Sequence, residues 1–261
     1  MVPQTILICY AGGMVQLVGI LNITPDSFSD GGDFDEPAIA IARAEQLFLD
    51  GASIVDIGAE STRPNATALT PDQEWQRLEP VLQVLIPKYP GKISIDSYHP
   101  ETIEHAFAIG PIIVNDVTGL NNPAMVAVVA KVQPPKVIIS HLPNMAIQDA
   151  HKVVPVSKST EVRDGLLAKA ELLEEQGISK SQIILDPGIG FGKTMQLNEQ
   201  LLDFADLVPD YEVMIGYSRK RFLGEQRMEL APNLTAGKRA IAHGASYLRI
   251  HDVAGHMSLR M

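Results

Sequence analysis

Eight short apolar runs alternate with longer amphipathic segments along this chain, and this alternation constrains the fold more than any other feature. The runs are nearly continuous in apolar, often β-branched residues, which is typical of parallel strands covered on both faces. Strands that alternate with helices predict a parallel β/α architecture. The runs span residues 15–22, 53–56, 93–96, 112–115, 137–140, 183–186, 213–216 and 247–251.

The segments between the runs have the spacing and the boundaries of helices. Thr70 precedes Pro71 where a helix is expected to begin, and Gly51, Gly177 and Gly244 lie where helices are expected to end. The predicted helices span residues 37–50, 72–88, 100–108, 122–131, 160–176, 196–205 and 235–244.

The 261 residues contain no linker and no low-complexity tract, so we expect a single domain over residues 1–261. A closed (β/α)8 TIM barrel is the economical arrangement of eight strand–helix units, and an open doubly wound sheet is the alternative. Only residues 252–261 follow the eighth run, which predicts an unusually short last helix.

Composition narrows the class of protein. Hydrophobic residues make up 46% of the chain and charged residues 20%, which excludes a disordered chain. The net charge of −10 disfavours a nucleic-acid partner, because proteins that bind nucleic acids usually carry a basic surface. Cys9 is the only cysteine, which excludes an intramolecular disulfide and a four-cysteine zinc site.

Residues 1–25 carry no charge, a pattern that a signal peptide or a membrane anchor could share. A signal peptide needs a basic flank, which this segment lacks, and its glycines and polar residues interrupt any run long enough to cross a bilayer. We therefore expect a β-hairpin segment over residues 1–14 with its turn at residues 11–13, no membrane partner, and a cytoplasmic location.

A polar or charged residue stands at or just past the end of every run. A single Asp in such a place is usually a helix cap or a turn residue, but capping does not explain the whole set. In a β/α barrel the C-terminal ends of the strands form the active site, so these side chains are expected to share one pocket. They are Asn22, Asp56, Glu60, Asp96, Asn115, Ser140, His141, Asp186, Ser218, Arg219, Lys220, Arg249 and His251.

The charges of the candidate residues fall into two groups. Asp96, Asn115 and Asp186 offer acceptors for an amidine-like edge with adjacent N–H donors. The other group suits an anion, because a guanidinium fork matches phosphate oxygens. Each cation alone is most simply a solvated surface residue, but together they predict a substrate that carries phosphate or diphosphate. This cationic group comprises Arg63, Lys220, Arg249 and His251.

Three familiar motifs are excluded because each lacks a glycine at a required position. Residues 187–194 nearly match a nucleotide P-loop, but Pro187 stands in place of its first glycine. Lys193 occupies the third glycine position of a dinucleotide fingerprint. Ser218 follows Gly216 and Tyr217 without the second glycine of a nucleophile elbow.

Taken in order, seven motifs make the chain resemble the dihydropteroate synthases of the pterin-binding barrel family over nearly its whole length. Any one of these motifs could arise by chance, but the ordered set is specific. They span residues 19–32, 56–64, 94–97, 115–117, 186–194, 216–220 and 249–253.

The resemblance implies that 6-hydroxymethyl-7,8-dihydropterin diphosphate is joined to 4-aminobenzoate, with release of diphosphate. It implies a dissociative substitution in which Mg²⁺ stabilises the departing diphosphate and Asp96 counters the charge on the pterin. Asp96, Arg63 and Lys220 are the implied catalytic residues, and the resemblance also implies a homodimer.

The resemblance implies a role for each matching position. The pterin is expected at Asp96, Asn115, Asp186, Lys220 and Arg249. The diphosphate is expected at Asn22, Arg63, Arg249 and His251, with Asn22 also binding Mg²⁺. The aminobenzoate is expected at Phe28, Thr62, Pro64, Phe191 and Ser218.

Two departures from the family's sequence pattern and two alternative functions stay open. Ser140 stands where the family usually has a methionine against the pterin, and the short C-terminal segment affects the late helices that form the family's dimer. One alternative is a pterin-dependent methyltransferase, which is not expected to keep the Thr62–Pro64 and Ser218–Lys220 elements. The other is a homologue that binds a pterin without turnover.

Overall fold

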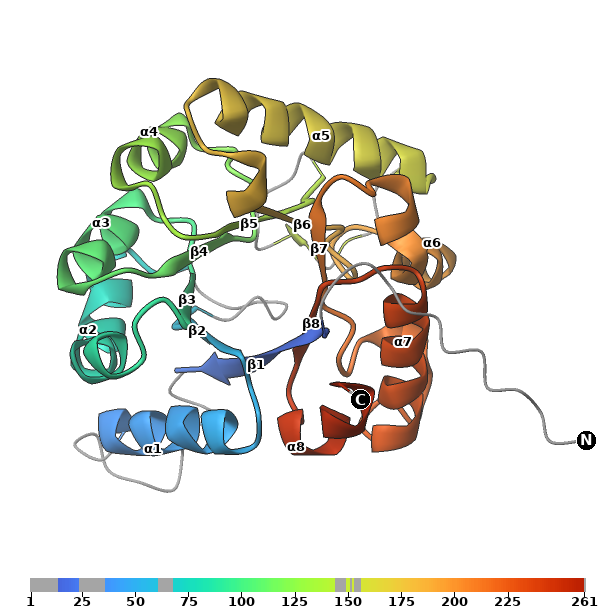
Figure 1. Cartoon of the computed structure of the whole chain (residues 1–261), viewed down its shortest axis with the longest axis horizontal. Helices are drawn as coiled ribbons and strands as arrows, with labels where there is room; N and C mark the ends of the chain where they lie inside the picture. The colour runs from blue at the N-terminus through green and yellow to red at the C-terminus, as the bar shows by residue number, and fades with distance from the viewer. Residues whose placement is uncertain are drawn as a thin grey trace, which may run out of the picture.

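Residues 14–23, 36–60, 68–143, 149–150, 152 and 156–260 are described by the computed structural model. Within them, eight parallel strands pair in sequence order, and β1 also pairs with β8, which closes the barrel seen in Figure 1. The predicted closed (β/α)8 barrel is confirmed, and the open sheet is excluded. The strands are β1 (Gln16–Asn22), β2 (Ile54–Gly58), β3 (Ile93–Asp96), β4 (Ile113–Asp116), β5 (Val137–Ser140), β6 (Ile183–Asp186), β7 (Glu212–Ile215) and β8 (Tyr247–Ile250).

The helices surround the barrel, as Figure 1 shows. They are α1 (Glu36–Leu49), α2 (Pro71–Lys88), α3 (Pro100–Ile109), α4 (Pro123–Val132), α5 (Ser159–Glu175), α6 (Met195–Gln200), α7 (Leu230–Ala242) and α8 (Val253–His256). The short last helix is as predicted. No helix in the described part of the chain is long and apolar enough to cross a membrane. Residues 1–13 of the predicted hairpin lie outside the described residues.

Two helix predictions were wrong. The helix expected over residues 196–205 is divided into α6 and a 3-10 helix, Leu201–Leu207, because an apolar pattern over so few turns does not distinguish the two pitches. Helix α7 begins at Leu230, five residues before the predicted start. Pro232 lies in its first turn, where a missing N–H breaks no helical hydrogen bond.

The predicted helix boundaries are formed by the expected caps. At the start of α2, the Thr70 hydroxyl accepts a hydrogen bond from the Gln73 N–H, and the Gln73 side chain accepts one from the Thr70 N–H. At the end of α1, Gly51 has a φ of 105°, and the next N–H, that of Ala52, donates back to the Leu47 carbonyl. Glycine adopts this conformation without the strain of a Cβ, which is why it ends the helix.

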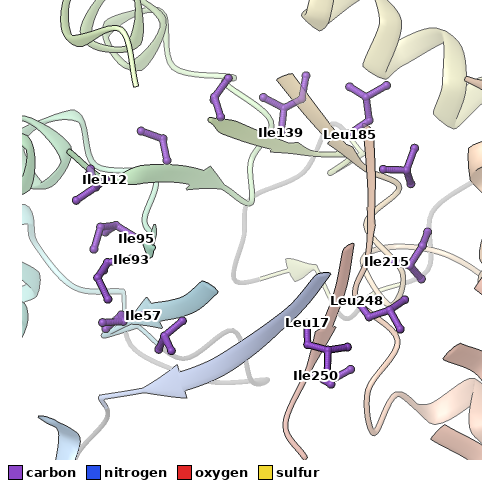
Figure 2. Close-up of a cluster of buried hydrophobic side chains, with 14 of the residues drawn as sticks. Leu17, Ile57, Ile93, Ile95, Ile112, Ile139, Leu185, Ile215, Leu248 and Ile250 are labelled. Carbon is purple, nitrogen blue, oxygen red and sulfur yellow. The ribbon is translucent and has the colours of Figure 1, made fainter. Parts of the chain in front are cut away.

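Each strand presents alternate side chains to the helices and to the barrel interior. Figure 2 shows the outer set, such as Ile57, Ile139 and Leu185, pointing from the strands toward the surrounding helices, where it forms the main core. A separate inner cluster, here called the lower layer, consists of Val18, Ile54, Ile113, Ile138, Ile184, Met214 and Tyr247. This layer fills the barrel below the C-terminal ends of the strands.

Two residues further along the same strands lies a second set of inward positions, here called the upper layer. It consists of Ile20, Asp56, Asn115, Ser140, Asp186, Gly216 and Arg249. The same alternation that builds the apolar lower layer therefore places charged and polar groups at the open end of the barrel.

Candidate active site

A pocket lies at the C-terminal ends of the strands, and nine of the predicted site residues line it. They are Asn22, Asp96, Asn115, Asp186, Phe191, Ser218, Lys220, Arg249 and His251. The other four, Phe28, Thr62, Arg63 and Pro64, lie outside the described residues. Of the thirteen strand-end side chains that were expected to share one pocket, ten line it, whereas Asp56, His141 and Arg219 do not.

Arg249 joins two carboxylates at the base of the pocket. Its Nε donates to Asp56 Oδ2 at 2.6 Å, and its Nη2 donates to Asp96 Oδ2 at 2.7 Å. Burial raises the pKa of Asp96 to about 7, although Arg249 acts against this shift. Burial by itself lowers the pKa of Arg249, but Asp56 and Asp96 outweigh it and the net shift is upward. The guanidinium therefore stays charged while Asp96 titrates near neutral pH.

Asp56 corrects one sequence prediction. The run that was expected to end at Asp56 continues to Gly58, so Asp56 lies in the middle of β2 and is fully buried. Its oxygens also accept hydrogen bonds from Asn115 Nδ2, at 3.2 Å and 3.1 Å. Among the described residues, the other amide atom, Asn115 Oδ1, is buried without a hydrogen-bond partner.

Asp186 both bonds to the turn that follows β6 and lines the pocket. Its Oδ1 accepts a hydrogen bond from the Gly188 N–H at 2.7 Å, which organises the turn after β6, and the residue also lines the pocket. Burial raises its pKa, opposed by the Gly188 hydrogen bond and by the positive charge of Lys220. A carboxylate with one oxygen bonded to the turn keeps acceptor capacity for a ligand.

Lys220 brings a cation next to an aromatic ring in the same pocket. Its Nζ lies 4.7 Å from the centroid of the Phe191 ring, within cation–π range. Burial lowers the pKa of Lys220 to about 8, and the nearby Arg249 adds to that shift. The ammonium is therefore charged at neutral pH, but it loses its proton at a lower pH than an exposed lysine does.

His251 is oriented by Ser218. The Ser218 hydroxyl is 3.0 Å from His251 Nδ1 and also accepts the His251 backbone N–H. Burial, followed by the positive charges of Arg219 and Arg249, lowers the pKa of His251 to about 4. The imidazole is thus neutral at pH 7 in the absence of an anion.

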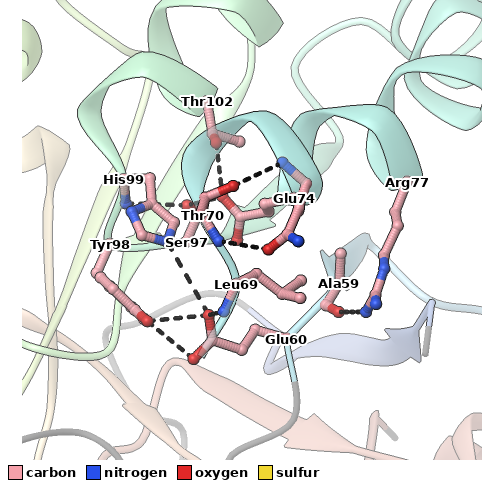
Figure 3. A network of polar contacts seen from close by, with 11 residues as sticks. Ala59, Glu60, Leu69, Thr70, Glu74, Arg77, Ser97, Tyr98, His99 and Thr102 are labelled. Atoms are coloured by element: carbon pink, nitrogen blue, oxygen red, sulfur yellow. Dashed lines mark hydrogen bonds and ion pairs between the residues drawn. The ribbon is translucent and has the colours of Figure 1, made fainter. Parts of the chain in front are cut away.

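A second polar network joins the pocket wall to α2, as Figure 3 shows. Glu60 lines the pocket, and both of its oxygens accept from the Tyr98 hydroxyl, at 2.8 Å and 2.9 Å. Further along, Ser97 and Thr102 donate to Glu74, whose pKa is raised by burial. This network fixes the loop after β3 against the start of α2.

Lys193 shows why the near-match to a P-loop carries no nucleotide chemistry. Its ammonium is almost fully buried and donates to the carbonyl oxygens of His141, Gly188 and Phe191, at 3.0, 2.8 and 3.0 Å. Burial lowers the pKa of Lys193 to about 7. The lysine joins the loops after β5 and β6 to each other rather than facing a phosphate.

The protein residues suit a metal ion that a substrate brings rather than one that the protein binds alone. Within the described ranges, no three His, Cys, Asp or Glu side chains come together as a metal-binding group. Asn22 is the exposed last residue of β1 and lines the pocket. A single neutral amide oxygen fits Mg²⁺, which is commonly bound through one or two protein oxygens together with substrate phosphates.

Sequence reasoning assigned no role to several residues that line the pocket: Ile20, Val117, Gly188, Ile189 and Gly216. Apolar side chains and glycines carry no chemical signal. Two of them could still have been found, because Ile20 and Gly216 lie two residues after the lower-layer positions Val18 and Met214.

Comparison with known proteins agrees with this geometry. The family model of pterin binding enzymes matches residues 18–251. The dihydropteroate synthase of Neisseria meningitidis serogroup C is 38% identical over 253 residues, which cover 91% of this chain and 88% of that protein. The enzyme of Bacillus subtilis (strain 168) is 35% identical and covers 91% of this chain and 83% of its own length.

Solved structures extend the likeness to three dimensions. A Clostridium difficile dihydropteroate synthase determined in the presence of pteroic acid has a TM-score of 0.85 and 33% identity, and covers 96% of each chain. The Xanthomonas albilineans enzyme in complex with 7,8-dihydropteroate has a TM-score of 0.80 and 33% identity, and covers 94% of this chain and 91% of that one. This chain therefore belongs to the dihydropteroate synthase family of pterin-binding enzymes.

Proposed function

We propose that this protein is a dihydropteroate synthase, a transferase that joins 6-hydroxymethyl-7,8-dihydropterin diphosphate to 4-aminobenzoate and releases diphosphate. The observation that carries the proposal is a pocket in which buried and half-buried acceptors lie beside cations. Asp96, Asn115 and Asp186 supply the acceptors, and Lys220 and Arg249 supply the positive charge.

The acceptors suit the pterin ring. A pterin presents adjacent N–H donors on its amidine-like edge, and Asp186 and Asn115 each have acceptor capacity that the described protein contacts leave available. An ionised carboxylate facing such donors forms charge-assisted hydrogen bonds, which are stronger than neutral ones. We assign the ring to these two residues and to Asp96, with Lys220 beside it.

The cations suit the leaving group. Arg249 and His251 line the pocket next to Asn22, and we assign the diphosphate to these residues together with Arg63. When bound, Mg²⁺ supplies further positive charge to the diphosphate, with the Asn22 amide oxygen as its protein ligand. An anion next to His251 favours the protonated imidazole, which then donates to it.

The reaction we propose needs no strong base. The bond between the exocyclic carbon of the pterin and the diphosphate oxygen breaks, and its electron pair leaves with the diphosphate. Delocalisation into the ring stabilises the cation that remains, and the carboxylate of Asp96 counters its charge. The amine of 4-aminobenzoate then forms the new C–N bond and afterwards loses a proton. We assign the aminobenzoate to Phe191 and Ser218, with Phe28, Thr62 and Pro64.

The test is incubation of the purified protein with the pterin diphosphate, 4-aminobenzoate and Mg²⁺, followed by chromatographic detection of 7,8-dihydropteroate and diphosphate. Formation of both in equal amounts is the expected result. Tight pterin binding without product would favour a non-catalytic homologue, and methyl transfer from a methylated folate would favour the methyltransferase alternative. Excess EDTA with metal-free substrate should abolish turnover, because the neutral Asn22 cannot offset the charge of the diphosphate.

Arg63 gives a second test of the same assignment. Arg63→Ala is expected to lower turnover strongly while a pterin that lacks diphosphate still binds as it does to the wild type. An equal loss of turnover and of pterin binding would mean that Arg63 contacts the pterin ring or stabilises the fold. The implied homodimer is a separate prediction, which sedimentation equilibrium of the purified protein tests.

A further inference from the structure

Asp56 is an upper-layer residue that, unlike Asp96, does not line the pocket. In the β2–β3 register Asp56 pairs with Ser94, two residues before Asp96, and its side chain is fully buried. It contacts two residues that line the pocket: Asn115 Nδ2 donates to both of its oxygens, and Arg249 Nε donates to Oδ2 at 2.6 Å. A buried carboxylate is costly unless such donors satisfy it, so the three side chains form one unit.

The bonds to Asp56 determine which end of the Asn115 amide faces the ligand. Because Nδ2 is directed at the carboxylate, Oδ1 is turned the other way. This oxygen is buried and has no partner among the described residues. An asparagine has nearly the same shape in either amide orientation, so the donor–acceptor partners decide which one it adopts.

We infer that Asp56 is a positioning residue for the pterin: it orients Asn115 so that the amide presents an acceptor to the ligand, and it fixes the Arg249 guanidinium beside Asp96. This inference rests on the proposed function. Asp56 acts through its neighbours and does not touch the ligand itself.

Asp56→Asn tests the inference because the substituted amide has one acceptor oxygen where the carboxylate has two. With its oxygen on Arg249 Nε, its NH2 faces Asn115 Nδ2, which lies 3.2 Å from Asp56 Oδ1; with the amide reversed, its NH2 faces Arg249 Nε. If Asn115 reverses to accept from that NH2, its own donor faces the donors of the pterin. If Arg249 moves away, the base of the pocket loses its cation. Either outcome weakens pterin binding, by roughly tenfold or more for an unsatisfied buried donor.

The matched control is Asp116→Asn, on strand β4, which is separated from β2 by β3. Asp116 is as fully buried as Asp56, but its oxygens accept from the Thr118 and Leu120 N–H groups and from the Thr118 hydroxyl. This variant measures what the loss of a buried carboxylate does to the fold alone. We expect its pterin Kd, measured by calorimetric titration with a pterin lacking diphosphate, to stay within roughly twofold of the wild-type value because no ligand-facing group changes.

The decisive variant exchanges the two side chains, Asp56→Asn together with Asn115→Asp. The new amide at position 56 can accept from Arg249 Nε and donate to the new carboxylate at position 115, which retains a free oxygen toward the ligand. The exchange restores an acceptor that faces the ligand, so pterin affinity should rise well above that of Asp56→Asn. A role limited to stability predicts instead that folded Asp56→Asn binds pterin as the wild type does.

The possible results divide clearly. Weak pterin binding by Asp56→Asn, with near-wild-type binding by Asp116→Asn and stronger binding by the exchange variant than by Asp56→Asn, supports the inference. Wild-type affinity in Asp56→Asn overturns it, and so does an exchange variant that binds no better than the single substitution. If Asp56→Asn does not fold, the exchange variant is compared with Asp116→Asn. An exchange variant that binds pterin supports the inference, and one that folds but binds no pterin while Asp116→Asn does overturns it. Wild-type protein that binds no pterin would instead overturn the proposed function.

Discussion

The lower and upper layers of the barrel interior are built by the same strands, two residues apart, and yet have opposite character. The lower layer is apolar on all seven strands that supply it, from Val18 on β1 to Tyr247 on β8. The upper layer, at the same inward phase of those strands, includes Asp56, Asn115, Asp186 and Arg249. One layer supplies apolar packing inside the barrel, and the other contains polar groups to which we assign the ligand, which is the division expected between the two ends of a β/α barrel.

The largest effect is expected when a polar side chain is placed in the apolar lower layer. Ile184 is fully buried in the lower layer of β6, and Ile184→Asn removes apolar contacts and buries an amide without partners. The expected cost is roughly 3–5 kcal/mol of unfolding free energy, from the cavity and desolvation terms together. Urea unfolding monitored by circular dichroism measures it, and a midpoint equal to that of the wild type would contradict the division.

The matched change two residues further along, Asp186→Asn, should have the opposite profile. The amide oxygen can still accept the Gly188 N–H, but the NH2 then faces the donors of the pterin, which should weaken pterin binding by roughly tenfold or more. Because burial raises the pKa of Asp186, a neutral side chain should leave the melting temperature unchanged or higher. Calorimetric titration measures the pterin affinity, and thermal melting measures the stability. A fall in melting temperature at unchanged affinity would mean that Asp186 only stabilises the turn.

The titration of two pocket-lining residues should limit the reaction on both sides of neutral pH. Asp96 has a pKa raised to about 7 and must be ionised to counter positive charge, whereas Lys220 has a pKa lowered to about 8 and must be protonated. The kcat/KM for the pterin substrate should therefore be greatest between these values and fall by about tenfold at one unit beyond either. Lys220→Arg keeps its charge at high pH, so it should remove the alkaline fall, and an unchanged alkaline limb would exclude Lys220 as its source.

The same carboxyl links pH to the stability of the ligand-free protein. The pKa of Asp96 in the folded state lies above its ordinary value, so the stability that it contributes is fully present below pH ~4 and is lost as the pH rises through about 7. Melting curves between these limits should show the loss, and Asp96→Asn should flatten the dependence.

Ser140 is expected to give the smallest effect. It is a buried upper-layer residue that lines the pocket, and the sequence resemblance implies a methionine at its position. Ser140→Met adds apolar surface against a flat ring but restricts a flexible side chain, so pterin affinity should rise only about twofold to threefold. A loss of affinity would show that the serine leaves space that this protein's ligand uses.

Much of this organisation was predictable because it depends on local patterns. Near-continuous apolar runs specified the parallel strands, and Thr70 and Gly51 specified a helix start and a helix end. The site residues that were found carry charge or amide groups at strand ends, where barrel geometry concentrates chemistry.

What could not be predicted depends on contacts between distant segments. Asp56 was predicted to end a strand, and nothing near it in sequence indicates that its partners are Asn115 and Arg249. The three carbonyl partners of Lys193 are likewise fixed by how the loops after β5 and β6 fold over each other. Spacing identifies which residues are available to a site, whereas pairing is decided by the closed fold.

The pairing of β1 with β8 has a consequence for how the protein reaches its active form. Arg249 lies 193 residues after Asp56 and 153 residues after Asp96, and it meets both carboxylates only when the last strand enters the sheet. Contacts over such separations form slowly, because the entropy of closing the loop must be offset before they stabilise the chain. During synthesis the two carboxylates that Arg249 joins, Asp56 and Asp96, are therefore made before Arg249 is. The last-made strand both completes the barrel and makes the pocket competent, so a chain interrupted before β8 retains most of the residues of the site but lacks the charge balance of the finished pocket.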